Sequence, residues 1–162
     1  MNTFLISDTH FSHSNILTFL NPDGSRLRSF DSVAEMDETM VENWNKVVKP
    51  NDRVYHLGDV CFKNAYLQAI MPRLNGTKVL IKGNHDELKP SQYLQYFKDI
   101  RACSILDKFL LTHIPIHPDS LSRWKANIHG HLHSNVVKLP DGTPDKRYIC
   151  LLYTSDAADD TR

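Results

Sequence analysis

A chain of 162 residues, 41% hydrophobic and 23% charged, is long enough to bury one core and too short for two full domains. Its 19 acidic and 19 basic residues balance, which gives no electrostatic case for a nucleic-acid or membrane partner. No apolar run approaches the length of a membrane span, and three widely spaced cysteines give no sign of a disulfide framework or a thiolate zinc site. We therefore expect a single-domain protein in the reducing cytoplasm.

Apolar runs and helical periodicities alternate along the chain and predict its elements in order. Strands are expected at 3–7, 53–57, 78–82, 109–112, 126–128 and 146–149, and helices at 32–48, 64–74 and 91–97. The first helix has the clearest pattern, because core-facing residues recur at three- and four-residue steps, at Val33, Met36, Met40 and Trp44. Ser32 opens a capping-box pattern just ahead of them.

The order of these elements predicts an α/β layer fold. Five of the strands end in a polar cluster that contains Asp, His or Asn. In open α/β sheets, ligands bind beyond the carboxyl ends of the strands. We therefore expect the five clusters to converge on one site.

The clusters offer the donors that a divalent cation needs. Seven oxygen and nitrogen donors lie at the expected strand ends: Asp8, His10, Asp59, Asn84, His113, His131 and His133. A donor set without thiolates suits Mn, Fe, Zn, Co or Ni. Seven donors are too many for one tetrahedral ion but enough for two ions that share a bridge, and the carboxylate of Asp59 is able to bridge.

The ordered set of motifs resembles the calcineurin-like metallophosphoesterase superfamily. The matching segments are Asp8-Thr9-His10, Gly58-Asp59, Gly83-Asn84-His85-Asp86, His113 and Gly130-His131-Leu132-His133. The resemblance covers residues 3–133, and it rests on the order of the full set, since each motif alone is weak. It implies a metallophosphoesterase-type β-sandwich flanked by helices in αββα layers.

The resemblance also implies roles for the residues. Asp8, His10, Asp59 and His133 are expected to hold one divalent metal ion, and Asp59, Asn84, His113 and His131 to hold the second. A hydroxide between the metals would attack phosphorus in line, so Asp59 takes part as the bridge. His85 is expected to act at the leaving-group oxygen as a general acid or charge stabiliser.

One departure from the family leaves the orientation of His85 open. Many members carry a second Asp that orients the catalytic His, and Phe62 stands at that position here. Either Asp86 or an unrecognised group orients His85, or His85 is less active. His13 and Asp86 are further candidates, for contacting substrate or for supporting the ligands.

The expected activity is hydrolysis of a small phosphomonoester or phosphodiester, because the chain has no room for a cap domain. A metal-binding scaffold that has lost catalysis is one alternative, and a nuclease is another. Three histidines are expected to be structural or surface residues: His56, His117 and His129. The substrate, the metal, the choice between monoester and diester, and the oligomeric state stay open.

Residues 150–162 differ from the rest of the chain. They show no turn logic or amphipathic period, and they resemble the translation of a transposase sequencing adapter that begins at Cys150. We therefore expect a C-terminally truncated domain at 1–149 and a non-native tail at 150–162. A short strand followed by an acidic tail is the alternative.

Overall fold

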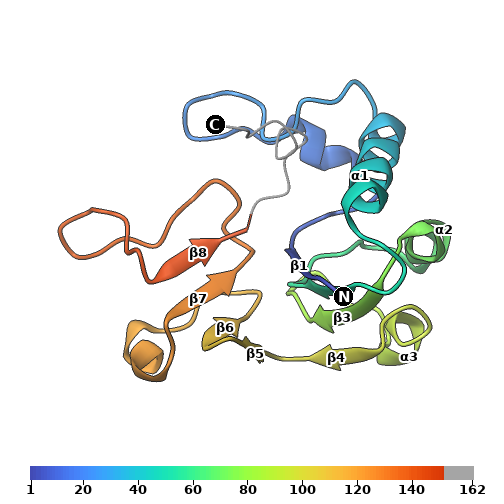
Figure 1. Cartoon of the computed structure of the whole chain (residues 1–162). Helices are drawn as coiled ribbons and strands as arrows, with labels where there is room; N and C mark the ends of the chain where they lie inside the picture. Colours follow the sequence, from blue (N-terminus) through green and yellow to red (C-terminus); the bar gives the residue numbers. More distant parts are fainter. Residues whose placement is uncertain (152–162) are drawn as a thin grey trace.

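The computed structural model describes residues 1–151 of the chain (Figure 1). Its strands are β1 Thr3–Ile6, β2 Arg53–His56, β3 Thr77–Ile81, β4 Asp99–Arg101, β5 Ser104–Leu106, β6 Phe109–Leu111, β7 Ala126–His129 and β8 Tyr148–Cys150. Its α-helices are α1 Val33–Val47, α2 Asn64–Ile70 and α3 Pro90–Tyr93, and its 3-10 helices are η1 Ser14–Thr18, η2 Met71–Arg73 and η3 Pro118–Arg123.

The strands form two four-stranded sheets. The first sheet has the order β1-β2-β3-β4 and is parallel throughout. The second has the order β5-β6-β7-β8, in which only the β5–β6 pair is antiparallel. Parallel pairs place the carboxyl ends of neighbouring strands at the same sheet edge, so the α/β prediction is confirmed and the strand-end clusters share one side.

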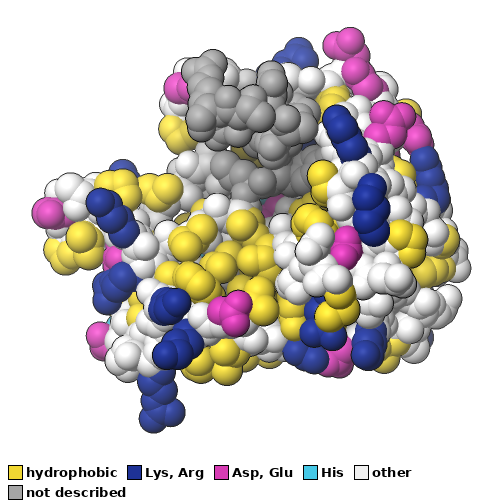
Figure 2. All heavy atoms as spheres, in the orientation of Figure 1, with side chains coloured by type: hydrophobic (Ala, Val, Ile, Leu, Met, Phe, Trp, Pro, Cys, Tyr) yellow, Lys and Arg dark blue, Asp and Glu magenta, His cyan; other side chains and the backbone are white. Residues whose placement is uncertain are grey.

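The hydrophobic core has two parts, one on each face of the first sheet. On the helical face, α1 and α2 bury their apolar stripes against β2 and β3, with Trp44, Ile70, Val54 and Leu80 among the buried residues. Between the sheets, β2 and β3 pack against β6 and β7 through residues such as Tyr55. Figure 2 shows hydrophobic side chains gathered at the surface between the two sheets.

The helix with the clearest sequence pattern is also the best predicted. Helix α1 begins after Ser32, whose hydroxyl accepts a hydrogen bond from the backbone N–H of Glu35 at 3.1 Å. Pro72 ends α2 early, so the expected helix at 64–74 is α2 followed by η2. The expected helix at 91–97 is the short α3 only, and β4 and β5 had no predicted counterpart.

The C-terminal segment is described only to residue 151. Cys150, the first residue of the expected non-native tail, is the last residue of β8 and pairs with His129 of β7. Residues 152–162 lie outside the described residues. Among the helices of residues 1–151, none combines the length and the hydrophobicity needed to cross a membrane.

Candidate metal centre

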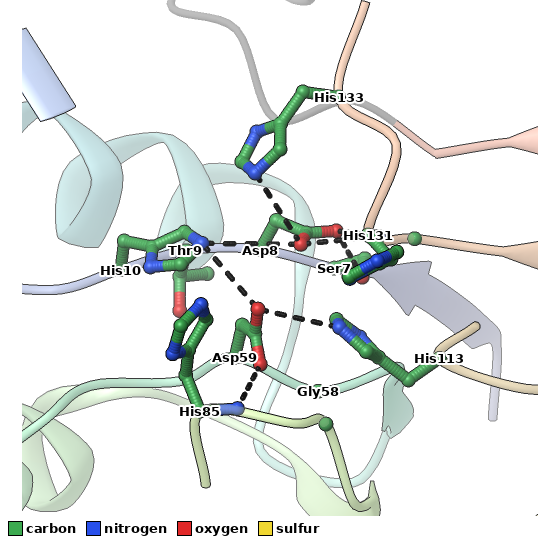
Figure 3. Close-up of polar contacts among 12 residues, drawn as sticks. Ser7, Asp8, Thr9, His10, Gly58, Asp59, His85, His113, His131 and His133 are labelled. Carbon is green, nitrogen blue, oxygen red and sulfur yellow. Dashed lines mark hydrogen bonds and ion pairs between the residues drawn. The ribbon is translucent and has the colours of Figure 1, made fainter. Parts of the chain in front are cut away.

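The seven predicted donors lie together at the carboxyl ends of five strands. Figure 3 labels all of them except Asn84. Asp8 and His10 follow β1, Asp59 follows β2, Asn84 follows β3, His113 follows β6, and His131 and His133 follow β7. The parallel registers of β1, β2 and β3 and of β6 and β7 bring these loops to one edge. The convergence expected from the sequence is therefore present in the structure.

One group of donors consists of Asp8, His10 and His133, whose ligand atoms lie within 4.8 Å of one another. His10 Nε2 and His133 Nε2 each lie 3.9 Å from Asp8 Oδ1. The other oxygen of Asp8 accepts a hydrogen bond of 2.6 Å from Ser7 Oγ. The backbone N–H of His131 also donates to the Asp8 carboxylate, so that carboxylate is held in one orientation.

The second group consists of Asp59, His113 and His131, and it has the same compactness. Asp59 Oδ2 lies 3.2 Å from His113 Nε2. The amide oxygen of Asn84 lies 2.9 Å from His113 Nε2 and 3.0 Å from His131 Nδ1, so it joins this group. Asp59 Oδ2 is also 3.7 Å from His10 Nε2, which places its carboxylate between the two groups.

His10 indicates that this arrangement fits a cation. Its side chain is almost fully buried, yet neither ring nitrogen has a hydrogen-bond partner within the described residues. Burial lowers the pKa of His10 to about 3, against the opposing charge of Asp59, so the ring is neutral and keeps a lone pair for a ligand. A buried polar atom without a partner costs stability, and a metal bond at this position would remove that cost.

Asp59 is held as a carboxylate. Burial raises the pKa of Asp59, but the hydrogen bond and charge of His113 outweigh it and bring the pKa to about 2. The pKa of His113 shifts the opposite way: burial lowers it, but the hydrogen bond and charge of Asp59 raise it further. The charged form of Asp59 is the form that can bridge two cations.

The backbone of the site adopts conformations that the rest of the chain seldom uses. Eight non-glycine residues of the described chain have positive φ, and five of them are candidate ligands: Asp8, His10, Asp59, His131 and His133. Each such conformation costs roughly 1–3 kcal/mol, and strain of this kind clusters at functional sites. Positive φ therefore recurs in each of the three loops that carry these ligands.

Three glycines let the site loops approach each other. An added Cβ on Gly83 would lie 2.3 Å from Asp59 Oδ1, and one on Gly130 would lie 1.9 Å from Ser7 Oγ. Gly58 combines a φ of 96° with a Cβ position 2.7 Å from His113 Nδ1. The glycines of the motifs are therefore explained by close packing around the carboxylates.

Asp86 supports the bridging residue from behind. Its Oδ2 accepts hydrogen bonds of 2.8 Å from the backbone N–H groups of Asp59 and Gly83, and its Oδ1 accepts one of 2.9 Å from Val60 N–H. The side chain is fully buried. Asp86 therefore supports a ligand, as one of its two expected roles had it, and its described hydrogen bonds go to backbone N–H groups and not to the His85 ring.

Two buried charged residues that sequence reasoning missed brace the loop after β1. Arg28 donates hydrogen bonds to the carbonyl oxygens of Asp8 and Thr9, the latter at 2.6 Å. Asp37 on α1 accepts bonds of 2.8 and 2.6 Å from the backbone N–H and the hydroxyl of Ser12. No sequence motif includes either residue. Arg28 binds backbone carbonyls that are distant in sequence, and Asp37 binds a loop residue that belongs to no motif.

His85 lies beside the donors without joining either group. Its backbone N–H donates to Asp59 Oδ1 at 2.9 Å, and its ring is 6.0 Å from that of His10 between centroids. Phe62 packs against His85 with centroids 5.1 Å apart. His13 is 4.5 Å from Phe62 and 5.6 Å from His10, so it lines the cleft, and it belongs to neither donor group.

The histidines expected to be structural lie outside the donor groups. His56 is completely buried, accepts a hydrogen bond from Gly58 N–H at Nδ1, and lies 3.0 Å from Thr9 Oγ1 through Nε2. His129 is buried in β7, with Nδ1 2.7 Å from the carbonyl oxygen of Gly130. His117 is exposed near Asp119. None of the three belongs to a donor group found among the described residues.

The fold and site define an α/β protein with two neighbouring histidine–carboxylate groups of metal-binding composition. The chain belongs to the family of the uncharacterized protein MJ1445 from Methanocaldococcus jannaschii, with which it is 40% identical over 135 residues. The aligned part covers 82% of this chain and 69% of that protein. The gene 66 protein of Mycobacterium phage L5 is 27% identical, with 84% of this chain and 79% of the phage protein covered.

A solved structure has the same fold. It is the crystal structure of a protein of unknown function, AQ665 from Aquifex aeolicus, and it is 30% identical to this chain. Its TM-score is 0.67, and the alignment covers 97% of this chain and 91% of that one. A comparison with models of protein families gives no match.

Proposed function

We propose that this protein is a dinuclear metal-dependent phosphoesterase that hydrolyses a phosphomonoester or a phosphodiester, with the layered sandwich of the metallophosphoesterases. The observation that carries the proposal is the pair of donor groups on either side of Asp59, together with a buried His10 that has no partner in the described chain. Two groups that share one carboxylate suit a pair of cations better than a single ion.

The residues divide between the two cation positions by distance. Asp8, His10 and His133 would hold one ion, and His113, His131 and Asn84 would hold the other, with Asp59 shared. Two divalent ions bound there would polarise the phosphoryl oxygens and lower the pKa of a bound water toward neutrality. Seven donors without a thiolate keep Mn, Fe, Zn, Co and Ni as candidates.

The leaving-group oxygen needs a residue that can protonate it, and His85 is the candidate. Hydrolysis forms a bond between water oxygen and phosphorus and breaks the ester bond to the leaving oxygen, which then needs a proton or a positive charge nearby. The His85 backbone is tied to Asp59 Oδ1, while its side chain is exposed to an incoming ester. These observations support the proposal that His85 donates a proton to the leaving oxygen.

The test is a screen of metals against aryl phosphate and aryl phosphodiester substrates. We expect Mn-stimulated turnover that Asp59→Asn lowers by roughly a thousandfold, because the shared carboxylate is lost. His85→Ala should keep both ions and lose about 100-fold or more in turnover, as expected for a general acid. Asp119→Asn and His117→Ala are matched controls, since both side chains are exposed, at 93% and 73%.

Two outcomes would contradict the proposal. Full turnover by Asp59→Asn would remove the shared carboxylate from the mechanism. A metal-loaded wild-type chain that hydrolyses none of the substrates would favour the metal-binding scaffold instead. A loss of one ion in His85→Ala would show that His85 is a ligand.

A further inference from the structure

A row of aromatic rings leads from the surface to the candidate metal centre. Phe19 lies 6.0 Å from His13, and His13 lies 4.5 Å from Phe62, between ring centroids. Phe62 in turn lies 5.1 Å from His85 and 5.8 Å from His10. Phe62 thus contacts three of the other four rings, among them that of His10, which is a candidate ligand.

A pocket of about 230 Å³ lies along this row. It is lined by Ser12, His13, Ser14, Phe62, Lys63 and Tyr66. Two of these residues are large aromatics, and the Lys63 ammonium lies 5.6 Å from the ring centroid of Tyr66. The pocket therefore combines flat apolar walls with hydroxyl groups and one cation.

Two aromatic side chains of this row, Phe62 and Phe19, stay exposed, whereas Tyr66 of the pocket packs partly against the core. Phe62 is 37% exposed and Phe19 is 45% exposed, although large aromatics are stabilised by burial. Exposed rings beside a site are typical of surfaces that stack on a planar group of a ligand.

We propose that this pocket is the leaving-group subsite and that it binds a planar aromatic ring carried by the phosphoester. The inference rests on the proposed function, because it is His85 that would meet the leaving oxygen. The ring of Phe62 contacts that of His85 and also lines the pocket, so a group attached to the leaving oxygen would lie next to the pocket. Phe62 thus sets substrate preference at the position where the resembled family has an acid.

The chemistry of the pocket is shared by two kinds of substrate, aryl esters and nucleotides. Both carry a planar ring that stacks on Phe62 and Tyr66, and stacking of this kind contributes roughly 1–3 kcal/mol per ring. Polar groups at the edge of a nucleobase would also meet the serine hydroxyls. An ester of a flexible sugar or polyol alone would leave the aromatic walls in water.

The experiment measures binding separately from turnover. Phenylphosphonate and methylphosphonate, which have no ester bond to hydrolyse, are titrated into the Mn-loaded protein by calorimetry. We expect phenylphosphonate to bind about tenfold more tightly. A second pair, adenosine monophosphate and ribose phosphate with the same primary ester, is compared by initial rates if hydrolysed and by binding heats if not.

Three variants separate a stacking role from a packing role. Phe62→Ala and Phe62→Leu should both reduce the preference for the ring-bearing ligand to less than about threefold, because leucine restores apolar area but no ring. Tyr66→Leu should weaken it partly. Val47→Ala, which truncates an apolar side chain exposed by 54% on α1, is the control and should keep the full preference.

The outcomes distinguish this inference from the proposed function. A preference for either ring-bearing ligand that Phe62→Ala removes supports the subsite, and the pair that shows it identifies the aryl or the nucleoside source. Equal affinity within both wild-type pairs, or a preference that survives Phe62→Ala, overturns it. If the preference depends on Phe62 but no phosphoester is hydrolysed, the pocket binds the ring, while the hydrolase proposal and the leaving-group role both fail.

Discussion

The helical face of the first sheet and its strand ends bury polar groups in different ways. On the helical face the buried side chains are mainly apolar, and the Trp44 indole N–H donates to the carbonyl oxygen of Asn75 at 2.9 Å. At the strand ends, His10 is buried without a partner in the described chain, and Asp8 and Asp59 have positive φ. The buried groups of the first region stabilise the fold. In the second region, the unpartnered ring nitrogens of His10 and the strained backbone cost stability, and a bound cation would offset that cost.

The largest expected effect on stability comes from a cavity on the helical face. Ile70 at the end of α2 is 5% exposed, so Ile70→Ala should lower the free energy of unfolding by about 2–5 kcal/mol. The number of bound metal ions should stay the same, because no candidate ligand lies on α2. Urea unfolding and metal analysis of the same samples test both statements. A chain that loses metal in proportion to stability would show that the two regions are not separate.

A smaller loss of stability with a larger loss of metal is expected at the strand ends. Gly130→Ala places a Cβ 2.2 Å from Asp8 Oδ2, so the carboxylate must move. We expect a cost of roughly 1–3 kcal/mol and a weakened affinity for the ion near Asp8.

Gly142→Ala is the matched control for that substitution. Its φ is 86°, but an added Cβ would have nothing within 4 Å, so it tests backbone strain without crowding a ligand. Its metal affinity should equal that of the wild type. Calorimetric Mn titration of both variants makes the comparison, and unchanged affinity in Gly130→Ala would refute the packing argument.

The most gradual effect is a pH dependence of stability that His56 contributes, spread over the interval between its folded and unfolded pKa values. Burial lowers the pKa of His56 to about 3, against 6.5 when the chain is unfolded. The unfolded state therefore binds the proton first as the pH falls, and stability present above pH 6.5 is lost progressively toward pH 3. With a chelator present to remove metal ions, the free energy of unfolding should change with pH less steeply in His56→Gln than in the wild type, by about 1 kcal/mol per pH unit. Thermal unfolding across this window measures it, and parallel slopes would mean that His56 does not carry the effect.

Much of the first region could be predicted from local patterns. The three- and four-residue spacing and the Ser32 cap locate α1 because they act within one helix. Strands β4 and β5 have only three residues each, and Asp99–Arg101 has no alternation long enough to detect. Their positions depend on pairing with β3 and β6, which is information that the segments themselves do not contain.

The donors of the second region could also be predicted, but the residues that hold them could not. Asp8, His113 and His131 stand in short motifs at strand ends, where side-chain type and spacing mark them. Arg28 and Asp86 act on backbone atoms, and backbone groups leave no trace in a side-chain pattern. The sequence allowed Asp86 to orient His85, and only the three-dimensional contacts show that it holds the Asp59 backbone instead.

The central claim is that the two donor groups bind a pair of cations that share Asp59. The most direct test is an anomalous difference map from a crystal of this chain soaked in Mn²⁺. We predict two peaks, one within bonding distance of Asp8, His10 and His133 and the other within bonding distance of His113, His131 and Asn84. Both peaks should contact Asp59. A single peak, or peaks away from these residues, would contradict the account.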